Sequence, residues 1–244
     1  MMRQSIPSKK LTGFDLKLAA CGSMLIDHAA VCLCVCGTPG FGQSDPVYLL
    51  MRCAGRLAFP IFCFLLVEGF YHTRSVAKYA LRLFAGALLS EAPFDYLLFG
   101  ENTGAWPEHQ NAYFTLLAGL LMLFALNRLA RLFSERKLYY NVSGLLLILV
   151  LGLAASACGL DYGFAGILVI AGFYYFRGNS RKLALYFAAV TLITGTAIQY
   201  AAVLALPLLL SYNGERGRRA GIGFYAFYPA HLAVFCVLRY VLLR

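Results

Sequence analysis

Charged side chains are scarce in this sequence: they make up 13% of its 244 residues, against about 25% in a typical soluble domain. No stretch is both polar and long enough to fold as a separate soluble domain, and we find neither an internal repeat nor a low-complexity segment. Hydrophobic residues make up 61% of the chain, more than one soluble core could bury. These features exclude an ordinary soluble protein and predict one domain, residues 1–244, that crosses a membrane several times.

Basic residues are missing from alternate loops. The segments 37–46, 100–110 and 157–163 contain no Lys or Arg. Bases gather instead in the segments 3–17, 74–82, 128–137, 177–182 and 216–219. Because basic loops face the cytoplasm, this pattern predicts a multi-pass membrane protein with its N-terminus in the cytoplasm. It also accounts for the net charge of +10 through contact with membrane lipid, without nucleic acid as a partner.

The hydrophobic runs predict an all-α, polytopic bundle of membrane helices. We expect helices at 14–36, 47–71, 76–99, 111–133, 142–158, 162–176 and 222–243. The remaining run, 183–212, would be about 45 Å long as one helix, which exceeds the bilayer and would leave the basic segment 214–219 outside. We therefore expect two short helices, 183–197 and 199–212, broken near Gly195. This gives nine crossings, with eight as the alternative.

The eight cysteines do not predict a metal site. Cys32, Cys34 and Cys36 alternate along one predicted helix, which would turn their sulfur atoms to different faces. We interpret them as small core residues and expect no metal.

Charged residues at membrane depth mark the first candidate site. The predicted helices 47–71 and 76–99 carry Arg52, Arg56, Glu68, Glu91 and Asp95 within their hydrophobic runs. Each such charge costs roughly 2.5–3.5 kcal/mol on insertion scales, so it is rarely placed there without a partner or a task. Mutual neutralisation without chemistry is the alternative.

The first predicted helix has a spacing that suits an anionic cofactor. Lys17 and His28 are eleven residues apart, close to three full turns, and therefore share a face. Lys17 lies near the expected cytoplasmic mouth and His28 about 16 Å deeper. Asp27 points about 100° away and is expected to orient another group, such as Arg56. The alternative is that both residues are simply bonded into the bundle.

The last predicted helix presents polar groups on neighbouring turns. Tyr225, Tyr228 and His231 recur at three-residue intervals, with Pro229 between two of them. A hydroxyl and an imidazole at this depth favour the polar wall of a cavity, whereas aromatic packing is the alternative.

Five motifs together resemble the TraX family, named after a conjugation protein that acetylates the N-terminus of processed F-type pilin. They read LTGFDLKL with MLIDH, then GRLAFPIFCFLLVEGFYHTR, LLSEAPFD, QNAYFTLL and YAFYPAHL. The resemblance implies an integral acyltransferase of the bacterial cytoplasmic (inner) membrane that uses acetyl-CoA or another acyl-CoA. Its acceptor would be an amine or hydroxyl of a polypeptide N-terminus, a glycan or a small molecule. The Lys17–His28 spacing is similar to the Arg-x10-His pattern of the wider transmembrane acyltransferases, with lysine in place of arginine.

With this resemblance, His28 is expected to be the general base, and either Asp27 or Glu91 would set its protonation state. An oxyanion would be stabilised by Arg56 or by the Tyr228–His231 pair. The residues expected at the cofactor are Lys17, Arg74, Lys78, Arg82, Glu68 and His72. Direct transfer and an acyl-His28 intermediate both fit the residues. The rival function is a small-molecule transporter or channel, which also needs intramembrane charge and broken helices.

Overall fold

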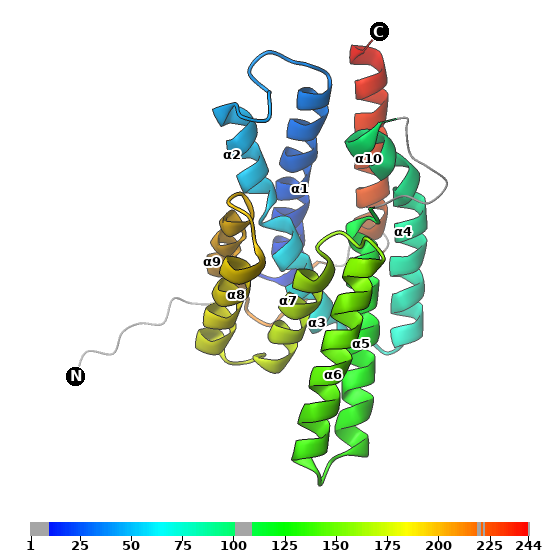
Figure 1. Cartoon of the computed structure of the whole chain (residues 1–244), viewed down its shortest axis with the longest axis vertical. Helices are drawn as coiled ribbons and strands as arrows, with labels where there is room; N and C mark the ends of the chain where they lie inside the picture. The colour runs from blue at the N-terminus through cyan, green and yellow to red at the C-terminus, as the bar shows by residue number, and fades with distance from the viewer. Residues whose placement is uncertain (1–9, 101–108, 219–220, 222, 244) are drawn as a thin grey trace, which may run out of the picture.

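The computed structural model describes residues 10–100, 109–218, 221 and 223–243, and the regular elements within this part of the chain are helices joined by loops (Figure 1). The elements are α1 (Gly13–Val35), α2 (Pro46–Gly55), α3 (Ala58–His72), α4 (Val76–Phe99), α5 (Ala112–Leu132), α6 (Lys137–Ala157), α7 (Gly163–Tyr175), α8 (Ser180–Thr194), η1 (Gln199–Ala205), α9 (Leu206–Leu210) and α10 (Gly223–Leu242). The described residues form isolated β-bridges but no strand. The all-α prediction is confirmed, and most predicted helix ends differ from the observed ones by one residue.

Within the described residues, five helical stretches are long and apolar enough to cross a membrane. They are Gly13–Val35, Pro46–His72, Ala112–Leu132, Lys137–Ala157 and Gly223–Leu242. Exposed leucines along α6, such as Leu145 and Leu153, are the apolar outer surface expected of helices that face lipid. These features support a multi-pass membrane protein. Helix length and apolarity do not confirm the predicted count of eight or nine crossings.

The predicted helix over 47–71 is present as one candidate span, Pro46–His72, but it is not continuous, because it is interrupted between α2 and α3 at Arg56 and Leu57. Pro60 has no N–H to donate to the Arg56 carbonyl, so the helical ladder cannot continue there. The Ser23 hydroxyl of α1 compensates at the end of α2: it lies 2.6 Å from the Ala54 carbonyl and 3.1 Å from that of Gly55. A Cβ on Gly55 would collide with Asp27, so glycine allows α2 to approach α1 at the break.

The prediction of a broken pair over 183–212 is confirmed. The chain leaves α8 at Thr194, turns at 195–198 and returns through η1 and α9. Three backbone hydrogen bonds then tie the segment after α9 to the start of α1: Leu11 N to Ser211 O at 3.1 Å, Asn213 N to Leu11 O at 2.8 Å, and Gly13 N to Glu215 O at 2.8 Å. The segment 211–218 therefore lies beside the beginning of α1.

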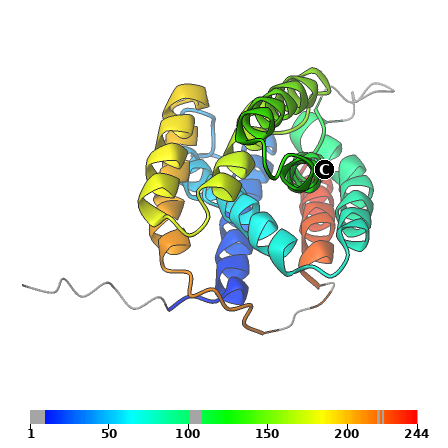
Figure 2. The same ribbon diagram turned by 90° about the horizontal axis from the view of Figure 1, so that it is seen from below.

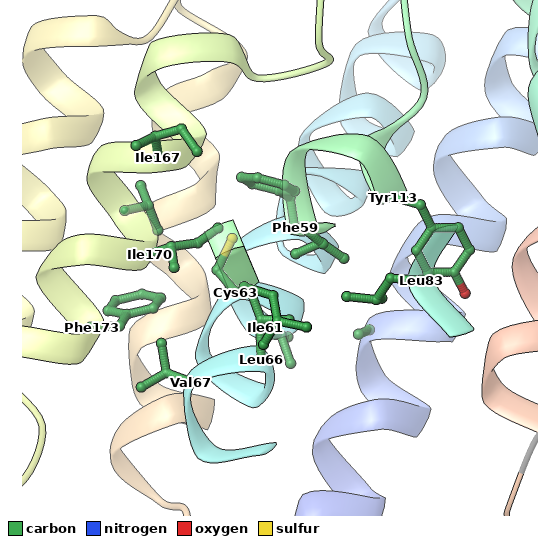
Figure 3. Packing of buried hydrophobic residues seen from close by; sticks show 14 of the residues in the cluster. Phe59, Ile61, Cys63, Leu66, Val67, Leu83, Tyr113, Ile167, Ile170 and Phe173 are labelled. Atoms are coloured by element: carbon green, nitrogen blue, oxygen red, sulfur yellow. The ribbon is translucent and has the colours of Figure 1, made fainter. Parts of the chain in front are cut away.

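Helix α3 runs through the middle of the bundle and packs against α1, α5 and α7 (Figure 2). Figure 3 shows Cys63 and Val67 of α3 on the side that faces Ile170 and Phe173 of α7. Lipid tails are as apolar as these side chains, so close packing contributes more here than transfer out of water. Helix α10 packs against both α4 and α1. Residues from the beginning and the end of the chain thus share one interior.

Candidate functional site

Two histidines from distant parts of the chain meet in this interior. Nδ1 of His28 on α1 lies 2.7 Å from Nε2 of His231 on α10, and the two rings meet edge to edge, with centroids 4.9 Å apart and an interplanar angle of 15°. Both residues are buried, as is Tyr228. The Tyr228 ring centroid is 6.0 Å from that of His28 and 5.5 Å from that of His231. The structure therefore brings together three of the predicted site residues.

A partly buried ion cluster lies next to this pair. Arg52 Nη1 is 2.6 Å from Asp27 Oδ2, while Arg56 Nη2 is 2.8 Å from Oδ1 and 2.9 Å from Oδ2. The predicted contact between Arg56 and Asp27 is present. The participation of Arg52 was not expected, although its spacing of four residues from Arg56 places both on one helical face. Both arginines act electrostatically on His28.

The turn between α6 and α7 completes the cluster with residues that the sequence analysis missed. Asp161 and Tyr162 interact electrostatically with Arg52, Arg56 and Asp27. Burial raises the pKa of Asp161 to about 6, even though nearby Arg56 lowers it. The feature of the sequence that could have pointed to Asp161 is that it is the lone charge in a short loop between apolar runs.

The backbone of this turn adopts a left-handed conformation at Tyr162, and hydrogen bonds fix it at Asp161. Tyr162 has a φ of 65°, which is costly for a residue with a bulky side chain, and its ring stacks 3.5 Å from that of Phe59. Asp161 N donates to Gln110 O at 2.8 Å, and the hydroxyl of Thr115 donates to the Asp161 carbonyl. The turn therefore holds Asp161 and Tyr162 against the ion cluster.

An open depression of about 720 Å³ lies at the same turn. Its lining includes His109, Ser156, Cys158, Tyr162 and Thr194. Tyr162 is therefore shared between the wall of the depression and the surroundings of Arg56.

Glu91 lies beside this group but is held by a different partner. Its Oε2 accepts hydrogen bonds from the side-chain and backbone N–H groups of Asn111, the fully buried N-cap of α5. It also acts electrostatically on Tyr228. In the described part of the chain, His28 forms no hydrogen bond with Glu91 or Asp27; its partner is His231. The expected effect of these carboxylates on His28 stays a prediction.

Part of the predicted cofactor set gathers around the start of α10. Lys17 Nζ lies 5.3 Å from the centroid of the Phe224 ring. Arg82 and Arg216 both act electrostatically on the Tyr225 hydroxyl, and Arg216 also acts on Lys17. We call Lys17, Arg82 and Arg216 the basic cradle. Arg216 was not among the predicted site residues, although the basic run 216–219 was visible in the sequence.

The other predicted cofactor residues lie elsewhere. Arg74 and Lys78 are exposed at the start of α4. Glu68 is ion-paired with Arg177, with Nε–Oε1 at 2.7 Å and Nη2–Oε2 at 3.1 Å, and His72 Nε2 lies 3.8 Å from Glu68 Oε2. The guanidinium of Arg177 stacks 4.3 Å from the centroid of Tyr71. Glu68 is thus already occupied by a cation of the chain.

The described residues contain no group of three His, Cys, Asp or Glu side chains placed to hold a metal ion. All eight cysteines are free thiols, and Cys158 is the exposed one.

Most of the chain is similar to one known protein family. The family model described as "TraX protein" matches residues 13–239, a range that includes all the residues of the site. This chain belongs to the TraX family. A curated relative is the probable fimbrial assembly protein FimC, serogroup H1, of Dichelobacter nodosus; it is 30% identical over 248 residues, covering 92% of this chain and 94% of the relative. No solved structure matches.

Proposed function

We propose that this TraX-family protein is a membrane acyltransferase that moves an acetyl or other short acyl group from acyl-CoA to an amine or hydroxyl. The observation that carries the proposal is the buried contact of His28 with His231 beside the cluster of Arg52, Arg56 and Asp27. A titratable base next to fixed positive charge is what acyl transfer requires, because a proton must leave the acceptor while an oxyanion develops.

The acyl donor would bind with its phosphates at the basic cradle. Lys17 carries a compact positive charge, and Arg82 and Arg216 supply planar guanidinium groups that suit phosphate oxygens. Lys17 lies about 16 Å along α1 from His28, a distance that an extended thioester arm would have to cover. The aromatic rings of Phe224 and Tyr225 lie at the same cradle and would offer contacts for a nucleotide base.

At the other end of that arm, His28 would take the proton from the acceptor nitrogen or oxygen as it attacks the thioester carbonyl carbon. The new C–N or C–O bond forms as the C–S bond breaks, and the leaving thiolate takes the proton from His28. Arg56 would stabilise the negative charge on the carbonyl oxygen. Its hydrogen bonds to the described residues use Nε and Nη2, which leaves the donors of Nη1 for a ligand.

The acceptor would approach through the depression at the α6–α7 turn, since Tyr162 connects that depression with the ion cluster. The relative's name connects it with fimbrial assembly, so we propose a polypeptide of a surface fibre as the first acceptor to test. We further propose a bacterial cytoplasmic membrane location with the N-terminus and the basic cradle facing the cytosol. In this arrangement α4, α7, α8 and the η1–α9 segment cross as well, giving nine crossings.

Two measurements test the function. Isothermal titration of the detergent-purified protein with CoA should give a saturable signal, whereas no signal at millimolar CoA would favour a transporter. Mass spectrometry of membrane polypeptides and glycans from cells with and without the gene should reveal a species that carries an acetyl group only when the gene is present. If no species differs between the two strains, the acyltransferase proposal fails.

A further inference from the structure

We infer that His231 is a positioning residue that fixes the tautomer of His28 and so leaves the lone pair of His28 on Nε2. The catalytic meaning of this tautomer rests on the proposed function, whereas the tautomer itself follows from hydrogen bonds within the chain. It assigns His231 a role different from the oxyanion stabilisation expected from the sequence.

The chain of contacts begins at a backbone carbonyl. His231 Nδ1 lies 2.8 Å from the carbonyl oxygen of Phe227, one turn earlier on α10. A carbonyl oxygen can only accept, so Nδ1 must carry the hydrogen. A neutral imidazole has one N–H group, and Nε2 of His231 is therefore an acceptor.

This acceptor faces His28. Because His28 Nδ1 lies 2.7 Å from His231 Nε2, His28 must donate from Nδ1. The lone pair of a neutral His28 then lies on Nε2, which has no hydrogen-bond partner among the described residues. An unpartnered basic nitrogen is what a general base presents to an incoming acceptor.

The opposite assignment would put a proton on both nitrogens of His231 and turn its Nε2 into a donor. That imidazolium would lie near the positive charges of Arg52 and Arg56, both of which act on His28. Among the described residues, Asp27 is the carboxylate ion-paired with these arginines, and it is already shared between them, while Asp161 acts on both from the neighbouring turn. The charges that surround the pair therefore favour two neutral rings.

Packing keeps the His231 ring in this orientation. The Phe227 ring stacks on one side with centroids 4.9 Å apart and an interplanar angle of 16°, and the His28 ring meets the His231 ring edge to edge at an angle of 15°. The Phe235 ring meets His231 edge-on at 6.2 Å. A ring held by three aromatic neighbours cannot turn its nitrogens without repacking.

The consequence for the reaction is that a proton taken from the acceptor enters His28 at Nε2. The resulting imidazolium still donates from Nδ1 to His231, now through a charge-assisted hydrogen bond. His231 thus supports the charge that forms on His28 without itself touching the substrate.

The test uses the fact that the chain has only four histidines, His28, His72, His109 and His231. Protein labelled with ¹⁵N-histidine, purified in detergent and studied near neutral pH, gives two-bond ¹H–¹⁵N correlations that identify each neutral tautomer. We expect both His28 and His231 to carry the hydrogen on Nδ1. In His231→Ala the His28 signal should leave this tautomer, and in His231→Gln it should return to it, because the amide oxygen can accept from Nδ1. His72→Ala, an exposed position, is the matched control and should not move the His28 signal.

Kinetics give the second readout. His231→Ala should lower turnover at saturating acyl-CoA by about 10²-fold or more, with the KM for acyl-CoA unchanged and part of the rate restored in His231→Gln. A His28 signal with its hydrogen on Nε2 in the unmodified protein overturns the inference, as does an unchanged His28 signal in His231→Ala. If the tautomers are as expected but no acyl transfer occurs, the proposed function fails and the positioning contact stands.

Discussion

Arg56 donates from one nitrogen, Nη2, to both carboxylate oxygens of Asp27, at 2.8 and 2.9 Å. Arg52 binds the same carboxylate, so two arginines depend on one aspartate. Removing the aspartate should therefore harm the fold more than removing either arginine. Asp27→Ala leaves two largely enclosed cations without their shared partner and should destabilise by roughly 3–5 kcal/mol, whereas Arg56→Ala leaves Asp27 with Arg52 and should cost roughly 1–3 kcal/mol. Thermal unfolding in detergent measures both; equal losses would show that the two arginines do not share Asp27.

The pKa of Asp161 predicts a dependence of stability on pH. Burial raises this pKa to about 6 from its ordinary value of 3.8, so the folded state binds the proton more tightly than the unfolded chain does. The resulting stabilisation is fully present below about pH 4 and is lost as the pH rises through about 6. The side chain in Asp161→Asn cannot ionise. The thermal unfolding midpoint of this variant, relative to that of the unmodified protein, should therefore increase as the pH is raised from 4 to 7. The exposed change Glu135→Gln controls for net charge, and a difference that stays flat with pH for Asp161→Asn would contradict the prediction.

The basic cradle should control the affinity for CoA. Lys17→Ala and Arg216→Ala should each weaken CoA binding roughly tenfold or more at low salt, and the difference should shrink as salt increases. Turnover at saturating acyl-CoA should fall much less, because neither residue lies beside His28. Arg136→Ala, an exposed arginine at the α5–α6 hairpin, is the matched control for loss of one positive charge. Binding that weakens equally in all three variants would mean that only net charge matters.

The ion pair of Glu68 and Arg177 should be structural. Arg177→Ala should lower stability by roughly 1–3 kcal/mol, because it leaves the buried Glu68 carboxylate with His72, 3.8 Å away, as its ion-pair partner. CoA affinity should not change in Arg177→Ala or in Glu68→Gln. Titration of both variants with CoA checks this, and weaker binding in Glu68→Gln would return Glu68 to the cofactor site that the sequence analysis assigned to it.

The sequence predicted local features well. Hydrophobic run lengths located most helices, the basic run 216–219 justified the broken pair over 183–212, and helical spacing placed Arg56 near Asp27. Each of these depends on residues near one another in the chain or on charge that must be neutralised at depth.

Contacts between distant segments could not be predicted in the same way. His28 and His231 are separated by 203 positions, and helical periodicity says which face a residue occupies but not which helix covers that face. Asp161 and Tyr162 were missed because their role depends on a turn held by Gln110 and Thr115 rather than on a motif. The break at Arg56 was also missed: Pro60 indicated a loosened carbonyl, but Ser23 and Gly55 are what make a full interruption possible.

The most direct test of the account is acyl transfer by purified His28→Ala, measured with radiolabelled acetyl-CoA and membranes from cells that lack the gene as the source of acceptor. CoA binding is measured in parallel by titration. Loss of the general base should lower transfer by about 10²–10⁴-fold while CoA affinity stays within a few-fold of the original, because the basic cradle lies three turns away along α1. Wild-type turnover in folded His28→Ala protein would contradict the central claim that His28 accepts the proton of the acceptor.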